Sequence, residues 1–300
     1  MFTLVGGHIS PILVAAERLG IRVIDTRHEV SAVFAADPVA RLSGKIGVAA
    51  VTAGPGLTNI VTAIKNAQMA ESPVLLMGGA AANLWKGRGA LQDIEQLKLF
   101  APICKFTATV TSLRDIVPTL RKAIQIAQSG TSGPVFVEFP IDTLYPYEDV
   151  SKEFANAPVG KGLQGKIASW YLNNYLANLF AGAFEQRDIS PLPVDIPMPV
   201  FSVVEKAVDM VKKSKKPLLI IGSQCMLPPT SVRRLKAAVE SMGIPCYLGG
   251  MARGLLGRDS SIQMRHSRRD ALREADCIIL AGAVCDFRLS YGRGLNRRAN

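Results

Sequence analysis

Residues 22–59 read RVIDTRHEVSAVFAADPVARLSGKIGVAAVTAGPGLTN, and their pattern already indicates a fold class. The run at 22–25 predicts a short strand, the Ala-rich run at 30–42 a helix, and the apolar run at 46–52 a second strand. A strand, a helix and a strand in this order form a right-handed βαβ unit, whose two strands lie parallel in one sheet.

The same alternation continues on both sides of this unit. Further strands are expected at 2–5, 74–77 and 135–139, and further helices at 11–19, 58–69, 91–100 and 114–127. Strands that alternate with helices build a parallel sheet between helical layers. We therefore expect residues 1–150 to form one Rossmann-like α/β domain, with a truncated N-terminus because the chain opens directly on a strand.

A second α/β pattern occupies residues 201–300. Helices are expected at 203–212, 230–242 and 268–275, and strands at 217–221, 245–248 and 277–281. The strand that would normally follow 281 is not found, so we expect this domain to be incomplete at its C-terminus.

Residues 151–200 interrupt the alternation with many prolines, which predicts an extended linker. The uncharged stretch at about 167–184 places its large apolar side chains on one helical face. Such an amphipathic helix can fold back on its own domain, dock on a partner or lie on a membrane surface.

The composition narrows the class of protein. The 300 residues are 48% hydrophobic and carry a net charge of +11, most of it from Val211 onward. A basic region of this kind suits nucleic acid, an acidic membrane surface or a phosphorylated ligand, but it can also be a solvated face. The basic half has almost no interleaved aromatic residues for base stacking, so no nucleic-acid partner is expected.

Two further site types are not expected. The five cysteines show no metal-ligand spacing and sit in apolar runs, so neither a disulfide framework nor a zinc site is predicted. No run reaches the roughly 18 to 20 apolar residues of a membrane span, so the chain as given is expected to be soluble.

Glu29 is the first candidate functional residue. It follows the predicted strand at 22–25 and opens the helix at 30–42, and open α/β sheets bind ligands beyond the carboxyl ends of their strands. An acidic residue is also favourable at a helix N-terminus without any ligand, so position alone leaves both interpretations open. The neighbouring His28 could orient Glu29, meet a substrate or be purely structural.

The glycine-containing turn at 52–59 is the second candidate. Gly54 and Gly56 allow the backbone to approach a ligand closely, and the amides of the following helix are free donors. The turn is neither a P-loop nor a GxGxxG motif, so it gives only weak support for phosphate binding.

Together these motifs carry a resemblance to a known family. The run from Arg27 to Asn59 resembles the pyrimidine-binding domain of thiamine-diphosphate (ThDP) enzymes of the acetolactate synthase and 2-hydroxyacyl-CoA lyase family. It has, in order, a strand-end glutamate, Ala-Ala-Asp, Ala-Arg and a Thr-x-Gly-Pro-Gly-x-Thr-Asn turn. The likeness continues to Leu91-Gln92-Asp93, where the family commonly has Phe-Gln-Glu, and residues 201–300 resemble the family's central domain more loosely. The whole chain is most similar to the animal acetolactate synthase-like proteins, in a truncated form.

The resemblance implies roles for individual residues. Glu29 would be catalytic, because a carboxylate hydrogen-bonded to the aminopyrimidine of the cofactor promotes removal of the thiazolium C2 proton. It implies that the ThDP pyrimidine pocket is formed by Glu29, Gly54, Pro55, Gly56 and Asn59. Gln92 and His28 would face the substrate, and His8 bears a weak likeness to a pocket-lining position.

The family holds Mg²⁺ on the diphosphate through a third domain with a Gly-Asp-Gly motif, and this sequence contains no Gly-Asp-Gly. The resemblance therefore implies no metal ligand in this chain and a homo-oligomeric full-length form, a dimer or tetramer, in which one subunit completes the site of another. On that basis the chain alone is expected to be inactive.

The resemblance leaves the reaction open between two chemistries. One is cleavage of a 2-hydroxyacyl-CoA to formyl-CoA and a shortened aldehyde in fatty-acid α-oxidation; the other is joining of 2-oxo acids by an acetolactate synthase. The basic residues of 201–300 suit the phosphates of an acyl-CoA and so favour the lyase, but the FAD that acetolactate synthases carry in their central domain has phosphates as well. The resemblance also implies association with the endoplasmic reticulum membrane through a segment that is not in this sequence. A non-catalytic nucleotide-binding module is the remaining alternative.

Overall fold

The structure is a computed structural model that describes residues 1–155 and 162–296. The chain divides into two compact units, Met1–Asp195 and Ile196–Asn300. Each unit contains one sheet, and every strand pair in both sheets is parallel. The expected α/β class with two parallel sheets is confirmed.

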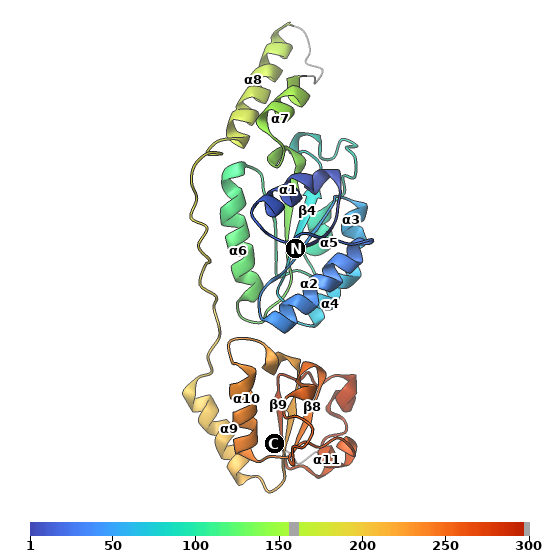
Figure 1. Cartoon of the computed structure of the whole chain (residues 1–300), viewed down its shortest axis with the longest axis vertical. Helices are drawn as coiled ribbons and strands as arrows, with labels where there is room; N and C mark the ends of the chain where they lie inside the picture. Colours follow the sequence, from blue (N-terminus) through green and yellow to red (C-terminus); the bar gives the residue numbers. More distant parts are fainter. Residues whose placement is uncertain (156–161, 297–300) are drawn as a thin grey trace. The chain divides into compact units, whose positions relative to one another are not determined.

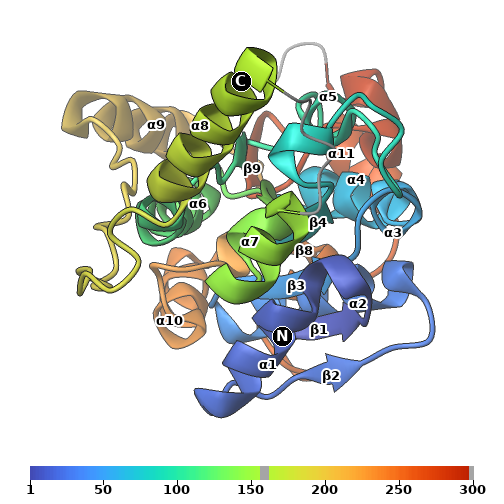
Figure 2. The ribbon, with the colours of Figure 1, turned by 90° about the horizontal axis from the view of Figure 1, so that it is seen from above.

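The first unit is built on a six-stranded sheet in the order β2-β1-β3-β4-β6-β5. Figure 2 shows β2, β1, β3 and β4 following one another across this unit. The strands are β1 (Phe2–Leu4), β2 (Ile24–Asp25), β3 (Gly47–Val51), β4 (Val74–Ala80), β5 (Phe106–Thr109) and β6 (Val135–Pro140). The central strands are apolar on both sides because both faces of the sheet are covered.

Helices cover both faces of this sheet. One core contains residues from α2 (Glu29–Ser43), α4 (Val61–Met69) and α5 (Gln96–Phe100), and the other packs α1 (Ser10–Arg18) and α6 (Ile116–Gln128) against the opposite face (Figure 1). Neighbouring residues of one strand face opposite cores: Leu76 packs in the first core, whereas Leu75 and Met77 pack in the second.

Two predicted helices differ from the structure. The expected helix at 58–69 is two helices, the short α3 (Pro55–Thr58) and α4, which are separated at Asn59 and Ile60. The expected helix at 91–100 is wrong over its first half, because only Gln96–Phe100 is helical. Gln92 has a φ of 61°, a left-handed conformation that an α-helix does not accommodate. Strand β5 was not expected at all.

The first unit extends beyond residue 150. Helix α7 (Tyr147–Ala155), which was not expected, packs with α8 (Gly162–Leu179) through Val150, Phe154, Leu176 and Leu179. The helix expected at 167–184 thus begins and ends earlier, and its C-terminal half packs on its own unit. The segment that follows it runs beside α6, where Arg121 and Gln125 donate hydrogen bonds to the carbonyls of Ser190 and Pro193, both at 2.7 Å.

The second unit contains a three-stranded sheet in the order β8-β7-β9. Its strands are β7 (Pro217–Ile221), β8 (Cys246–Leu248) and β9 (Cys277–Ala281), and its α-helices are α9 (Phe201–Lys213), α10 (Val232–Met242) and α11 (Arg268–Glu274). All six agree with the predicted elements to within two residues. Apolar clusters lie on both faces of this sheet as well. Within the described residues, no helix has the length and apolar character needed to cross a membrane.

Candidate functional site

Glu29 is the first residue of α2, and the residues before it fix this start. The Thr26 hydroxyl lies 3.0 Å from the Thr3 carbonyl and 3.0 Å from the His28 carbonyl. The Nδ1 atom of His28 accepts a hydrogen bond of 3.1 Å from the backbone N–H of Val30, so His28 is the N-cap of the helix. The Glu29 side chain is thereby held at the carboxyl end of β2, and the residue is only 9% exposed.

The two carboxylate oxygens of Glu29 have different surroundings. The Asn59 amide donates a hydrogen bond of 3.0 Å to Oε2. Oε2 also lies 3.8 Å from Nδ1 of His28, but that nitrogen already accepts the Val30 N–H and so carries no proton in this geometry. No described residue donates a hydrogen bond to Oε1. One oxygen is therefore held in place, and the other can accept a donor from a ligand.

The glycine turn brings backbone close to this carboxylate. An added Cβ at Gly56 would lie 3.8 Å from Glu29 Oε1 and 2.8 Å from Cγ2 of Thr52. Gly54 has a φ of +60°, and a Cβ there would lie 2.8 Å from the Gln92 carbonyl oxygen. Glycine is required at 54 by both conformation and space, and at 56 by space alone. Pro55 occupies the first turn of α3, where its missing N–H costs nothing.

A buried polar network supports the turn from behind. Gln96 accepts a hydrogen bond of 2.9 Å from the Gly54 N–H and donates to the Gly79 carbonyl at 3.0 Å and to Glu138 at 2.6 Å. Glu138, which is 2% exposed, also accepts from Thr109 at 3.0 Å and pairs with Lys86. The sequence interpretation missed both Gln96 and Glu138. The available signal was a lone acidic residue inside the apolar strand β6.

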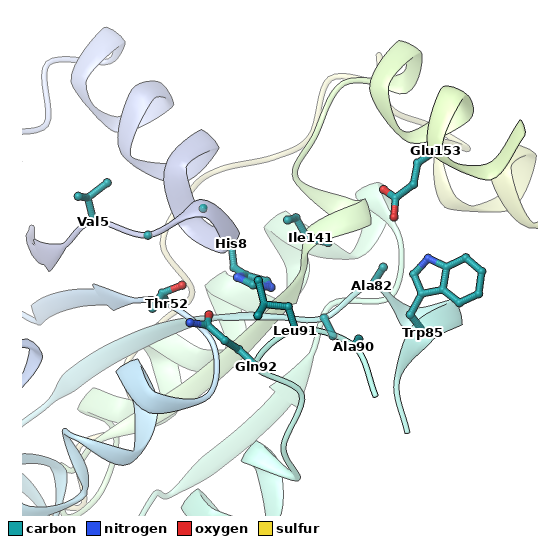
Figure 3. Close-up of a pocket in the computed structure, with 13 residues that line it drawn as sticks. Val5, His8, Thr52, Ala82, Trp85, Ala90, Leu91, Gln92, Ile141 and Glu153 are labelled. Carbon is teal, nitrogen blue, oxygen red and sulfur yellow. The ribbon is translucent and has the colours of Figure 1, made fainter. Parts of the chain in front are cut away.

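An open cavity of about 540 Å³ lies next to the turn, at the carboxyl ends of β1, β3 and β4. Figure 3 shows His8, Leu91 and Gln92 near its centre, with Trp85 and Glu153 together on one side. The cavity is lined by Val5, Gly6, Gly7, His8, Thr52, Ala81, Ala82, Trp85, Ala90, Leu91, Gln92, Ile141 and Glu153. Burial lowers the pKa of His8, which favours the neutral imidazole.

The structure therefore separates the expected site residues into three positions. Glu29 and Asn59 are in contact, and the turn of Gly54, Pro55 and Gly56 lies beside them. Gln92 lines the neighbouring cavity together with Thr52, whose methyl group lies close to Gly56. His28 caps α2 with a side chain that is 55% exposed, and it does not line that cavity.

The donor set fits an aminopyrimidine. A carboxylate with one oxygen fixed and the other able to accept a hydrogen bond suits a ring nitrogen that carries a proton, and the absent side chain at Gly56 leaves room beside it. By contrast, the described residues contain no group of three or more His, Cys, Asp or Glu side chains that could hold a metal ion.

Comparison with known protein families assigns both units. Residues 1–99 match the family described as "Thiamine pyrophosphate enzyme, N-terminal TPP binding domain", and residues 204–300 match "Thiamine pyrophosphate enzyme, central domain". The chain belongs to the thiamine pyrophosphate enzyme family. The first match contains Glu29, the glycine turn, Asn59 and Gln92. ThDP is therefore the cofactor that these domains imply, and the family resemblance inferred from the motifs is confirmed.

Curated relatives of this chain include proteins named as lyases and proteins named as acetolactate synthases. "2-hydroxyacyl-CoA lyase 2" of Danio rerio is 67% identical over 100% of this chain and 48% of its own length, and that of Homo sapiens is 64% identical over 99% and 47%. An acetolactate synthase large subunit of Mycobacterium tuberculosis is 33% identical over 97% of this chain and 47% of its own length. The chain spans about half the length of the curated relatives it matches.

Proposed function

We propose that this chain is part of a ThDP-dependent lyase that cleaves a 2-hydroxyacyl-CoA to formyl-CoA and an aldehyde one carbon shorter. The observation that carries the proposal is the Glu29 carboxylate, fixed by Asn59 beside the glycine turn, in a chain 67% identical to a relative named 2-hydroxyacyl-CoA lyase 2. The reaction needs no oxidant, because the hydrogen lost from the 2-hydroxyl group reappears on the formyl carbon.

The chain's own residues would act as follows. ThDP, when bound, supplies the electron sink for breaking the carbon–carbon bond beside the carbonyl. Glu29 would accept a hydrogen bond from the aminopyrimidine through Oε1, and Asn59 would keep the carboxylate aimed at that ring. Gln92, Thr52 and the neutral His8 would contact the substrate in the adjacent cavity, whose remaining lining is largely apolar.

Further features of the proposal involve parts of the relatives that this chain does not span. We propose that Mg²⁺ and the diphosphate are held by a third domain, that subunits of a homo-oligomer complete each other's sites, and that this chain alone is inactive. We also propose that the full-length protein associates with the endoplasmic reticulum membrane, and cell fractionation would test this location.

The test compares this chain with a form extended to the length of the relatives, each assayed with ThDP and Mg²⁺ for formyl-CoA release. The extended form should be active, and Glu29→Gln should reduce its activity by about a hundredfold or more, because general acid–base assistance is of this size. Glu17→Gln, which changes an exposed carboxylate in α1, is the matched control and should have full activity.

The outcomes separate the candidate functions. Acetolactate formed from pyruvate in place of formyl-CoA would favour the synthase, which the relative at 33% identity supports less strongly. An extended form that neither reacts nor binds ThDP in a calorimetric titration would contradict both the lyase and the synthase proposal. A non-catalytic nucleotide-binding module would then be the remaining candidate function.

A further inference from the structure

Glu138 is a buried carboxylate in the middle of an apolar strand. It lies in β6 between Val137 and Phe139, and it is only 2% exposed. Burying a charged group costs free energy unless its partners compensate, whereas an apolar side chain at this position would add to the core. The sheet itself therefore does not need a carboxylate here, and the contacts of Glu138 indicate another role.

The two oxygens of Glu138 contact three other segments of the first unit. Oε1 pairs with Lys86 and accepts a hydrogen bond of 3.0 Å from the Thr109 hydroxyl, while Oε2 accepts one of 2.6 Å from the Gln96 amide. Lys86 follows Trp85, a residue of the cavity wall, and Thr109 lies in the edge strand β5. The carboxylate is therefore shared between the cavity wall, the sheet edge and the first residue of α5.

Backbone groups fix the orientation of the Gln96 amide. Its oxygen accepts the N–H of Gly54 at 2.9 Å, and its nitrogen donates to the carbonyl of Gly79 at 3.0 Å as well as to Glu138. A carboxylate only accepts hydrogen bonds, so it meets the nitrogen of this amide and not the oxygen. Glu138 thus favours the same orientation that Gly54 and Gly79 need, and the reversed amide would break all of these hydrogen bonds.

The Gly54 N–H is the point at which this network reaches the candidate site. Gly54 has a φ of +60°, and glycine can leave such a conformation easily because no side chain restricts its backbone. Two residues further on, a Cβ at Gly56 would lie only 3.8 Å from Oε1 of Glu29. A shift of the turn at Gly54 would therefore change the space beside the carboxylate oxygen that can accept a donor from a ligand.

We propose that Glu138 is a positioning residue that acts through Gln96. It sets the orientation of the Gln96 amide, which holds the Gly54 N–H and keeps the glycine turn in place beside Glu29 for the aminopyrimidine ring. The inference deepens the proposed function and rests on it for ThDP as the occupant. An amide at position 138 would present donors as well as an acceptor, so Glu138→Gln removes the constraint on Gln96 while keeping the size of the side chain.

The first test measures amide hydrogen exchange of Gly54 by NMR in this chain, without ThDP. The wild-type amide should be protected, and Glu138→Gln should speed its exchange about tenfold relative to the Leu76 amide in β4, which reports opening of the sheet. Thr109→Val is the matched control, because it removes another hydrogen bond to the same carboxylate and leaves the Gln96 contact intact. It should change this ratio less than about twofold.

The second test measures ThDP affinity by calorimetry in the form extended to the length of the relatives, with Mg²⁺ present. Glu138→Gln should weaken binding about tenfold and Thr109→Val less than about twofold, because only the first disturbs Gly54. Adding Gln96→Glu to Glu138→Gln exchanges the two groups, so the carboxylate at 96 can accept both the Gly54 N–H and the new amide. This double variant should bind ThDP more tightly than Glu138→Gln alone, a rescue that a residue needed only for folding would not show.

Exchange of Gly54 at the unprotected rate in the wild-type chain would overturn the proposal without any variant. Equal effects of Glu138→Gln and Thr109→Val, or a double variant that binds ThDP no more tightly than Glu138→Gln, would overturn it as well. Failure of the lyase proposal is read separately, since an extended wild-type form that releases no formyl-CoA does not alter the exchange of Gly54 or the titrations with ThDP.

Discussion

Gly56 shows how much of the candidate site depends on one absent side chain. Its φ is not in the left-handed region, so another residue could adopt the backbone conformation. The space is the limitation, because a Cβ would lie 2.8 Å from Cγ2 of Thr52, and closer contacts than the usual van der Waals distance force neighbours to move. Thr52 is the residue that would have to move, because the new methyl group would lie at an ordinary contact distance of 3.8 Å from Oε1 of Glu29.

Gly56→Ala should therefore lower the free energy of unfolding by about 1–3 kcal/mol, as overpacking does. Thr52→Ser removes the clashing methyl group, so the double variant should recover most of the loss. Urea unfolding of the single and double variants measures this, with Gly7→Ala as the control, because a Cβ at Gly7 meets nothing within 4 Å. Equal losses with and without Thr52→Ser would show that the contact is not the cause.

His8 makes a prediction about pH. Burial lowers its pKa below the ordinary value of 6.5, so the unfolded chain binds a proton more readily than the folded protein. The free energy of unfolding should therefore fall as the pH decreases through this value. Denaturant unfolding at about pH 7.5 and about pH 5 should show a larger decrease for the wild-type chain than for His8→Gln, which has no imidazole. An identical decrease in both proteins would mean that other groups carry the dependence.

Helix α8 is divided between a packed and an exposed half. Tyr175 packs edge-on against Phe154 and donates a hydrogen bond of 2.5 Å to the buried Asp142, and Arg114 donates to Asn178 at 2.8 Å. Towards its N-terminus, Leu163, Trp170 and Tyr171 are each more than half exposed. Attachment of the helix to the first unit therefore depends on a few contacts near its C-terminal end.

Tyr175→Phe keeps the ring packing and removes the hydroxyl donor to Asp142. Losing a hydrogen bond to a carboxylate should weaken the attachment of α8 by about 1.5–3 kcal/mol, so its amides should exchange with solvent faster than in the wild type. Hydrogen–deuterium exchange measures this for each helix separately. Tyr171→Phe is the matched control, because that ring is 54% exposed, and faster exchange in both variants would argue against the Asp142 bond as the attachment.

For the whole molecule, the sequence predicted the sheets well and the polar interior poorly. Central strands such as Val135–Pro140 are buried on both faces and form apolar runs, which makes them easy to identify. The edge strand Phe106–Thr109 has only partly buried residues and two threonines, so its pattern resembles a loop. Helix α7 lies in a stretch that contains prolines, and that composition concealed it.

The candidate site, like the fold, was predictable from the sequence only where it consists of local motifs. The strand-end glutamate and the glycine turn are local motifs. They follow β2 and β3, which are parallel and separated only by β1, so both lie at the same edge of the sheet and meet at Asn59. Gln96 and Glu138, by contrast, are 42 residues apart, and no spacing rule relates them.

The charge of the chain is divided unequally between its two units. Residues 196–300 contain 18 Lys and Arg against 8 Asp and Glu, whereas residues 1–195 contain 17 against 16. Nearly all of the excess is therefore in the second unit. Because a unit with excess positive charge attracts anions over a distance set by the Debye length, association of anions with this unit should be faster at low ionic strength.

The N-cap at His28 has a consequence for how this protein diverges in evolution. His28 acts on the start of α2 through a single acceptor atom, which receives the Val30 N–H. Ser, Thr, Asn and Asp supply an equivalent acceptor at this position. Lineages can therefore exchange the residue at 28 among these types while Glu29 stays where it is, so divergence at that position would not by itself indicate a new reaction.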